Sequence, residues 1–353
     1  MYFVLLFTTA SAQDTLKHQE FVPSGKMVIQ VFGYSKFDVS ENTKQALSFG
    51  CTRAHFGYKY EFSPTLTGKV ILDVAGRTTS VGDISVTDTA GNKLKVTNTS
   101  IEGSYYTTFL KFAYIQWQPS DQLILQVGGI LQNHYITQEK FWGYRYVYET
   151  FQDRYYGTAS GDWGAICYVK VNETIGFDAA VTNGEGIRSK QDPFGKVKYA
   201  AGIDIKPDKN LITRFYYDNN ASGDTLRNAT QNLFSLFVGY RSENLFRIGV
   251  DANYRTNNQN YFSHDAYGYS LFGTYIVTPA IEFFARYDKV MSNTLSGVVR
   301  NWNYANDGQA HIAGFQYQPV KTIKFALDYQ GWTPEDTSSP MKNFITVNTE
   351  YSL

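Results

Sequence analysis

The stretch Phe246 to Arg255, FRIGVDANYR, decides the fold. Apolar and polar side chains alternate along it without interruption, with Arg247, Asp251 and Arg255 on the polar side. Strict alternation over about ten residues is typical of a β-strand with one apolar and one polar face. Strands of soluble sheets usually run to about five or six residues, whereas a membrane-spanning strand needs about nine to eleven. The stretch therefore predicts a transmembrane strand whose charged side faces water.

The same pattern recurs along the chain and predicts an all-β protein of sixteen strands. The expected strands are 28–37, 47–62, 66–77, 107–118, 123–131, 163–171, 175–183, 196–206, 211–218, 233–241, 245–255, 266–277, 281–289, 309–318, 323–330 and 343–353. Short and long connections alternate strictly, and five of the seven short ones carry a proline directly after the strand. Short turns on one side and long loops on the other are typical of transmembrane barrels. We therefore expect residues 27–353 to form a closed, antiparallel transmembrane β-barrel, whose lumen at this strand number is wide enough for water.

The first residues predict a segment that is removed on export. An apolar run from Tyr2 to Phe7 precedes the small residues Ala10-Ser11-Ala12, which is the shape of a secretory signal peptide without its positive n-region. The alternative is a buried strand, which would need a partner before the polar run that follows. We expect residues 1–12 to be the signal peptide and residues 13–26 to be a periplasmic N-terminal segment.

Composition narrows the function classes. The 353 residues carry a net charge of zero, which argues against a nucleic-acid partner. An aromatic content of 16% suits a barrel with aromatic residues at both membrane interfaces, although a soluble β-sandwich array shares it. The five histidines show no metal-ligand spacing, and no serine lies in a supported pairing with one. We expect no cofactor, no metal and no enzymatic activity.

Several short runs resemble one family of channel proteins. They are FGCTRA at 49–54, Gly128-Gly129, VTNGEG at 181–186 and FARYD at 284–288. Through them the chain resembles the bacterial outer-membrane porins of the phosphate-selective porin O/P type and their Bacteroidota relatives, over nearly the whole length that follows residue 12. The resemblance implies a homotrimer of sixteen-stranded barrels in the outer membrane of a Gram-negative bacterium, surrounded by lipid and lipopolysaccharide. It also implies a third loop, here Gln132 to Gly161, that folds into the barrel and narrows the pore.

The third loop differs from that of phosphate-selective relatives, which the resemblance describes as rich in lysine. The residues expected at the constriction carry both signs: Lys140, Arg145 and Arg154 with Glu149 and Asp153. This mixture makes selectivity for phosphate doubtful and leaves the general porin role intact. The alternative is a surface loop whose many aromatic residues form an outer cap.

The inferred lumen side of the strands carries thirteen basic and eight acidic residues. The basic set is Arg53, Lys59, Lys69, Arg77, Lys196, Lys198, Lys206, Arg214, Arg241, Arg247, Arg255, Arg286 and Lys324, and the acidic set is Glu61, Asp73, Asp204, Asp218, Asp251, Glu282, Asp288 and Asp328. The excess predicts weak anion preference, with Arg53, Arg214, Arg247, Arg286, Asp251 and Asp288 on the pore wall. The alternative is that opposite charges on neighbouring strands only neutralise each other.

These observations favour an outer-membrane porin through which small hydrophilic solutes and ions diffuse passively. One alternative is a substrate-specific channel for phosphate or an oligosaccharide. The other is a barrel plugged by its loops that acts as an adhesin or a scaffold.

Overall fold

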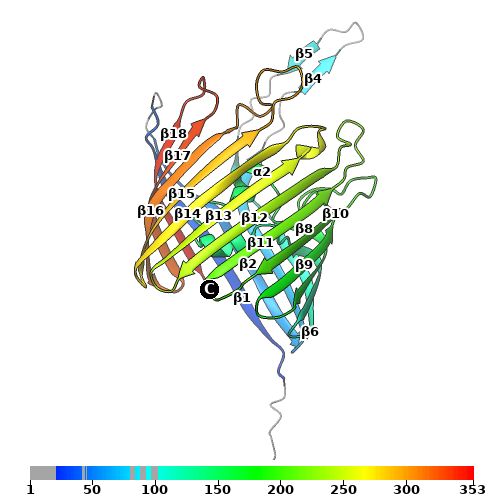
Figure 1. Ribbon diagram of the computed structural model, residues 1–353, viewed down its shortest axis with the longest axis vertical. Coiled ribbons are helices and arrows are strands. Elements are labelled where there is room, and N and C mark those ends of the chain that lie inside the picture. The colour runs from blue at the N-terminus through cyan, green and yellow to red at the C-terminus, as the bar shows by residue number, and fades with distance from the viewer. Residues whose placement is uncertain (1–20, 42–43, 45, 80–83, 88–92, 97–101) are drawn as a thin grey trace, which may run out of the picture.

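The protein is a closed β-barrel of sixteen antiparallel strands (Figure 1). The computed structural model describes residues 21–41, 44, 46–79, 84–87, 93–96 and 102–353. The barrel strands are β1 Ser24–Asp38, β2 Leu47–Ser63, β3 Leu66–Thr79, β6 Glu102–Ser120, β7 Leu123–Leu131, β8 Gly161–Lys170, β9 Ile175–Thr182, β10 Lys198–Ile205, β11 Leu211–Asn220, β12 Gln231–Ser242, β13 Phe246–Thr256, β14 Ala266–Thr278, β15 Ile281–Ser292, β16 Gly308–Val320, β17 Ile323–Pro334 and β18 Lys342–Ser352. The strand number, antiparallel order and closure predicted from the sequence are confirmed.

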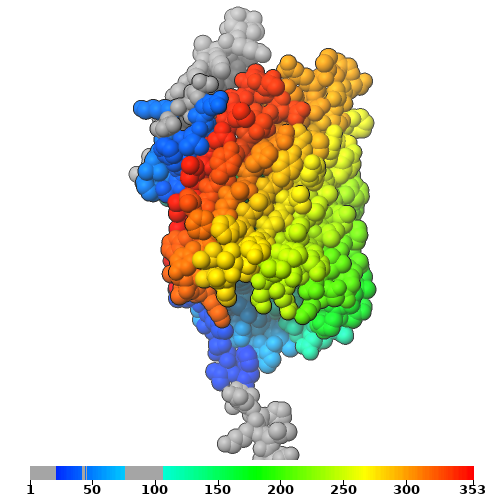
Figure 2. Space-filling view, turned by 60° about the vertical axis from the view of Figure 1, so that its left-hand side comes forward, coloured from blue at the N-terminus to red at the C-terminus, as the bar shows by residue number. Residues whose placement is uncertain are grey.

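The first and last strands close the ring. β1 pairs with β18 from Gln30 opposite Ser352 to Asp38 opposite Phe344. Figure 2 shows the same closure, with the blue N-terminal strand beside the red C-terminal ones. A closed ring pairs the backbone amides that an open edge would leave exposed to lipid, where each unpaired group costs several kcal/mol.

The alternation in β13 separates an exposed apolar face from a buried polar face. Ile248, Val250 and Tyr254 are 42–48% exposed on the outer face, while Asp251 and Arg255 are 1% and 3% exposed on the inner one. β18 alternates in the same way, with Ile345 and Val347 outside and Asn348 inside. The barrel thus presents an apolar exterior and a polar interior.

The strands lean across the barrel, and short turns meet at the end where the C-terminus lies (Figure 1). The opposite end carries the longer connections and is called the long-loop end below. The connection between β3 and β6 contains two further strands, β4 Ile84–Thr87 and β5 Lys93–Val96, which form a separate two-stranded sheet.

Most strand boundaries shift by a few residues from those expected, and three of these shifts affect the predicted regions or wall residues. β1 begins at Ser24, before the predicted barrel start at 27, because it pairs with β2 from Ser24 opposite Glu61. β10 spans 198–205, so Lys196 and Lys206 lie beyond its two ends and are exposed. The predicted signal peptide lies outside the described residues.

In the described part of the chain, no helix is both long enough and apolar enough to cross a membrane.

Candidate functional site

The connection between β7 and β8, residues 132–160, is the largest structured connection and is called the third connection here. It holds two short helices, α1 Ile136–Trp142 and α2 Phe151–Tyr156. Each helix ends at a glycine in the left-handed region, Gly143 at φ 78° and Gly157 at φ 57°. Glycine adopts this conformation without steric cost and therefore terminates helices well. These two ends turn the chain sharply enough to keep both helices against one side of the wall.

Aromatic side chains of α1 pack on inward-facing residues of the wall. The ring centroid of Phe141 is 5.3 Å from that of Phe237 in β12, in an edge-to-face arrangement. The ring centroids of Trp142 and of Phe272 in β14 are 5.1 Å apart, and Trp142 is fully buried. Edge-to-face pairs at such distances contribute about 0.5–1.5 kcal/mol beyond the area they bury. Rings from both elements thus form one continuous apolar cluster.

Two glycines make room for this contact. A Cβ atom at Gly239 in β12 would lie 2.6 Å from Cε2 of Phe141. A Cβ atom at Gly268 in β14 would lie 2.6 Å from Cζ of Phe151. Because real Cβ contacts are not this short, any larger residue at either position would push an α1 or α2 ring off the wall.

Buried arginines tie the connection to the wall with charge-assisted hydrogen bonds. Arg214 is 1% exposed; it donates to both carboxylate oxygens of Asp178, at 2.7 and 3.1 Å, and to the Asn133 carbonyl at 2.8 Å. Arg286 is 4% exposed; it forms two 2.8 Å hydrogen bonds to Asp288 and a third to the Glu149 carbonyl. Bidentate arginine–carboxylate pairs fix geometry strongly. Both arginines therefore hold the backbone of the third connection in place.

Other expected wall residues also face the third connection. Glu282 accepts hydrogen bonds from the Tyr144 hydroxyl at 2.5 Å and from Arg247 at 3.1 Å. Asp288 accepts one from the Tyr155 hydroxyl at 2.8 Å.

Asp251 is 1% exposed and lies 3.4 Å from the Ser235 hydroxyl, which also accepts a hydrogen bond from Gln152 of α2. The structure thus places Arg214, Arg247, Arg286, Asp251 and Asp288 where they contact or underlie the third connection. Alternation along a strand identifies the inner face on which these residues lie, but it does not indicate what packs on that face.

Arg53 of the expected pore wall lines a cavity opposite α2. It forms an ion pair with Asp73 at 3.2 Å, and His55 lies 3.3 Å from the same carboxylate. Lys111 of β6 lies nearby and hydrogen-bonds Ser160 at the end of the third connection. These wall residues define a basic face with one carboxylate.

The third connection presents an acidic face. Arg145 lies at the centre of three carboxylates: Glu139 at 3.0 Å, Glu149 at 3.6 Å and Asp153 at 2.7 Å. Arg154 joins them through Glu149 at 3.4 Å. Burial raises the pKa of Glu139 and of Asp153, while Arg145 opposes the shift in both. The acidic face therefore loses charge at a higher pH than exposed carboxylates would.

The two faces border one cavity of about 580 Å³ lined by Arg53, Asp73, Lys111 and Asp153, among others. Four of the five expected constriction residues, Arg145, Glu149, Asp153 and Arg154, come together in one ion-pair network. Lys140 does not join them: it is exposed and lines a different cavity toward the short-turn end. The arrangement can hold water and ions between fixed charges of opposite sign.

Sequence reasoning missed Lys111, whose β6 strand alternates poorly. β6 shifts register against β3 between Ile71 and Leu72, which disrupts the period of two. The only signal was a single lysine inside the apolar run FLKFA at 109–113.

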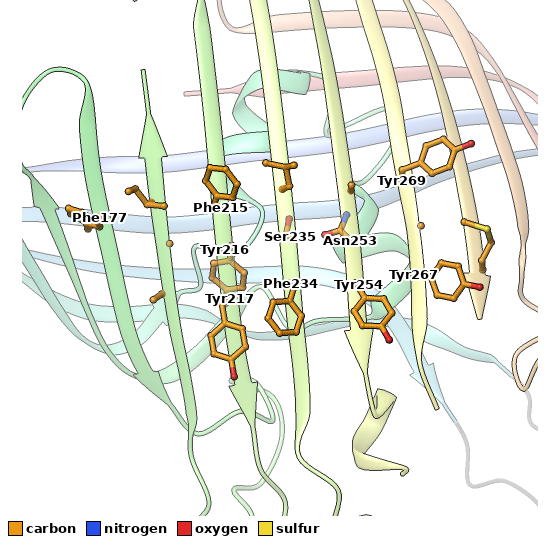
Figure 3. Close-up of a pocket in the computed structure, with 17 residues that line it drawn as sticks. Phe177, Phe215, Tyr216, Tyr217, Phe234, Ser235, Asn253, Tyr254, Tyr267 and Tyr269 are labelled. Atoms are coloured by element: carbon orange, nitrogen blue, oxygen red, sulfur yellow. The ribbon is translucent and has the colours of Figure 1, made fainter. Parts of the chain in front are cut away.

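A depression of about 770 Å³ lies on the outer wall (Figure 3). Phe215, Tyr217, Phe234 and Tyr254 around it are 39–48% exposed on the outward face. Small residues such as Ala201 and Ala252 form its floor. Most of its lining belongs to the apolar exterior, and the buried residues Tyr216, Ser235 and Asn253 also border it.

Among the described residues, no three or more His, Cys, Asp or Glu side chains are grouped so as to hold a metal ion.

No protein-family model and no curated protein sequence matches the chain. Its fold is that of outer-membrane channel barrels, as comparison with solved structures shows. The outer-membrane channel DcaP of Acinetobacter baumannii matches with a TM-score of 0.64 and 15% identity, over 94% of this chain and 97% of that one. The anion-selective porin from Comamonas acidovorans matches with a TM-score of 0.64 and 8% identity, over 94% and 100%. The trimer form of OmpT, an outer membrane protein of Vibrio cholerae, matches with a TM-score of 0.57 and 12% identity, over 94% and 100%.

Proposed function

We propose that the protein is an outer-membrane diffusion channel for small hydrophilic solutes and ions, in a Gram-negative bacterium. The observation that carries the proposal is the closed sixteen-stranded barrel with an apolar exterior and a charged interior. Barrels of sixteen to eighteen strands leave a lumen that side chains on the wall cannot fill. The similar fold of a channel and of an anion-selective porin supports it.

The third connection folds into the lumen in this proposal and narrows the pathway to the cavity between Arg53 and Asp153. Its contacts with inward-facing residues of β11, β12, β14 and β15 support this arrangement. Solutes then pass between a basic wall and an acidic connection. Fixed charges that line a narrow aqueous path set which ions enter it.

Selectivity in this proposal is weak and favours anions. Around the cavity the basic residues Arg53, Lys111, Arg145 and Arg188 are matched by nearby carboxylates. Toward the long-loop end the balance is more positive, because Lys36, Arg154 and Lys342 line one cavity. Selectivity for phosphate is not part of the proposal, since most buried arginines are already paired.

The assembly in this proposal is a homotrimer surrounded by lipid and lipopolysaccharide, with residues 1–12 as its export signal and the residues between 12 and β1 as a periplasmic segment. Support comes from the trimer form of a protein with the same fold. The protein carries out no chemistry of its own.

The test is reconstitution of the detergent-purified protein in a planar bilayer, with conductance and zero-current potential measured under a salt gradient. The proposal expects open channels in steps of three with a small anion-directed potential. Cation preference would refute the charge assignment. A folded barrel without conductance would refute the channel and favour an adhesin or scaffold.

A further inference from the structure

A second cavity, of about 510 Å³, lies toward the long-loop end on the other side of α2. It is lined by residues far apart in sequence, among them Lys36 of β1, Arg154 and Tyr155 of α2, Trp302 before β16, Trp332 of β17 and Lys342 of β18. Its volume falls within the range of about 300–1,000 Å³ that is usual for small-molecule sites. Arg154 also belongs to the charged network described above, whereas Arg53 and Lys111 do not line this second cavity.

The charge of this cavity is one-sided. Lys36, Arg154 and Lys342 are its ionisable cations, and none of the described residues that line it is an aspartate or glutamate. The positive charges of Arg154 and Lys342 and the negative charge of Asp38, which is not in the lining, all act on Lys36. Arg154 is half-exposed, and its carboxylate partner Glu149 is shared with Arg145. Like charges held together in a partly enclosed space attract an anion, because it relieves their repulsion.

The cavity also offers flat aromatic surfaces in fixed positions. Trp332 and Tyr155 stack with their planes 29° apart and ring centroids 5.9 Å apart. The Trp302 indole N–H donates to the Asp265 carbonyl at 2.8 Å, which fixes that ring as well. Rigid rings with little conformational freedom to lose favour contact with the apolar face of a ligand.

Amide side chains complete the lining. Asn303, Asn306 and Gln330 all border the cavity. The Asn306 amide donates to Asn303 at 2.9 Å, and Gln330 donates to the Val147 carbonyl at 3.2 Å and to Asp328 at 2.8 Å. Amides both donate and accept hydrogen bonds, so their remaining capacity suits hydroxyl groups.

We propose that this cavity binds acidic carbohydrate, a short sugar chain that carries carboxylates, as it enters from the long-loop end. The aromatic rings cover the C–H faces of the sugar, the amides bind its hydroxyls and the three cations bind its carboxylates. An aromatic carboxylate without hydroxyls would leave the amides unused. The inference deepens the proposed channel function and rests on it for the role of the site, since it names a preferred class of solute.

The binding test uses the purified protein in detergent, with digalacturonate as the probe and tryptophan fluorescence as the readout. Two of the five tryptophans line the cavity. We expect saturable binding of digalacturonate and at least about tenfold weaker binding of its uncharged dimethyl ester, a loss of about 1.4 kcal/mol. Benzoate is the second probe, and binding of benzoate without binding of digalacturonate would overturn the inference.

A matched pair of variants locates the site. Lys36→Gln with Lys342→Gln should weaken digalacturonate binding about tenfold. Lys26→Gln with Lys321→Gln removes the same charge from exposed positions at the short-turn end and should change it less than twofold. Equal effects of the two pairs, or equal binding of acid and ester, would overturn the inference.

A planar-bilayer measurement separates this inference from the proposed function. With digalacturonate present, we expect concentration-dependent, saturable block of the current in the natural protein and a weaker block in the Lys36→Gln, Lys342→Gln variant. Open channels that digalacturonate does not block would refute the site and leave the channel. Fluorescence binding without any conductance would refute the channel and leave the site.

Discussion

Replacing Arg53 by glutamine removes the one expected wall arginine that lines the cavity facing α2. Its side chain is 18% exposed, whereas Asp73 beside it is fully buried and keeps His55 as a second partner. The change therefore subtracts one positive charge from the pathway with little loss of wall packing. We expect the anion-to-cation permeability ratio of the channel to fall.

The magnitude follows from the position of the charge. An ion that passes about 5 Å from a unit charge in water interacts with it by about 0.8 kcal/mol, which screening at 0.1 M salt reduces to about 0.5 kcal/mol. The charge acts with opposite sign on cations and anions, so its loss lowers the anion-to-cation permeability ratio about fivefold. At 1 M salt the Debye length is about 3 Å and the change shrinks to less than about twofold.

The assay is the zero-current potential of channels in a planar bilayer under a tenfold gradient, measured at low and at high salt. Lys321→Gln, at an exposed short turn, is the control with the same charge change. The reasoning is refuted if Arg53→Gln and Lys321→Gln shift the potential equally, or if the Arg53→Gln shift is the same at both salt concentrations.

Three further predictions concern the acidic face, the lipid face and the contact between α1 and the wall. Lowering the pH from 7.5 should move the zero-current potential toward anions, because the raised pKa values of Glu139 and Asp153 let these carboxylates lose their negative charge at a higher pH than exposed carboxylates would. Val250→Arg should lower the free energy of unfolding in liposomes by about 2–4 kcal/mol, measured by urea titration, since it puts a charge in lipid near the middle of β13. Gly239→Ala should make single-channel current larger and noisier by displacing the ring 2.6 Å away, whereas Gly273→Ala, whose nearest neighbour would be 3.7 Å away, should leave it unchanged.

The barrel could be predicted from the sequence because the pattern that specifies each strand lies within that strand's own residues. Alternation with a period of two assigns each strand two faces wherever it occurs, as Ile248 and Asp251 show in β13. Prolines such as Pro64 and Pro279 directly follow strands at the short turns, so the strand number and the two ends of the barrel follow from the sequence order.

The interior could be predicted only in part because its contacts are not local. Arg214 and Arg286 were assigned correctly to the inner face, yet no spacing indicates that Asn133 and Glu149 supply backbone carbonyls to them. The charged residues around Arg145 were predicted individually, and only the folding of α1 and α2 brings them together into one network. These pairings depend on how the third connection packs across the barrel, which strand periodicity does not encode.

The most direct test of the central account is cysteine modification during single-channel recording, in a background with Cys51→Ser and Cys167→Ser. Arg53→Cys places a thiol beside the cavity of the pathway, and Ala310→Cys places one at a fully buried position beneath the third connection. A negatively charged methanethiosulfonate reagent should lower the current of Arg53→Cys channels in discrete steps and leave Ala310→Cys channels unchanged. Equal modification of both, or block only in Ala310→Cys channels, would contradict the account.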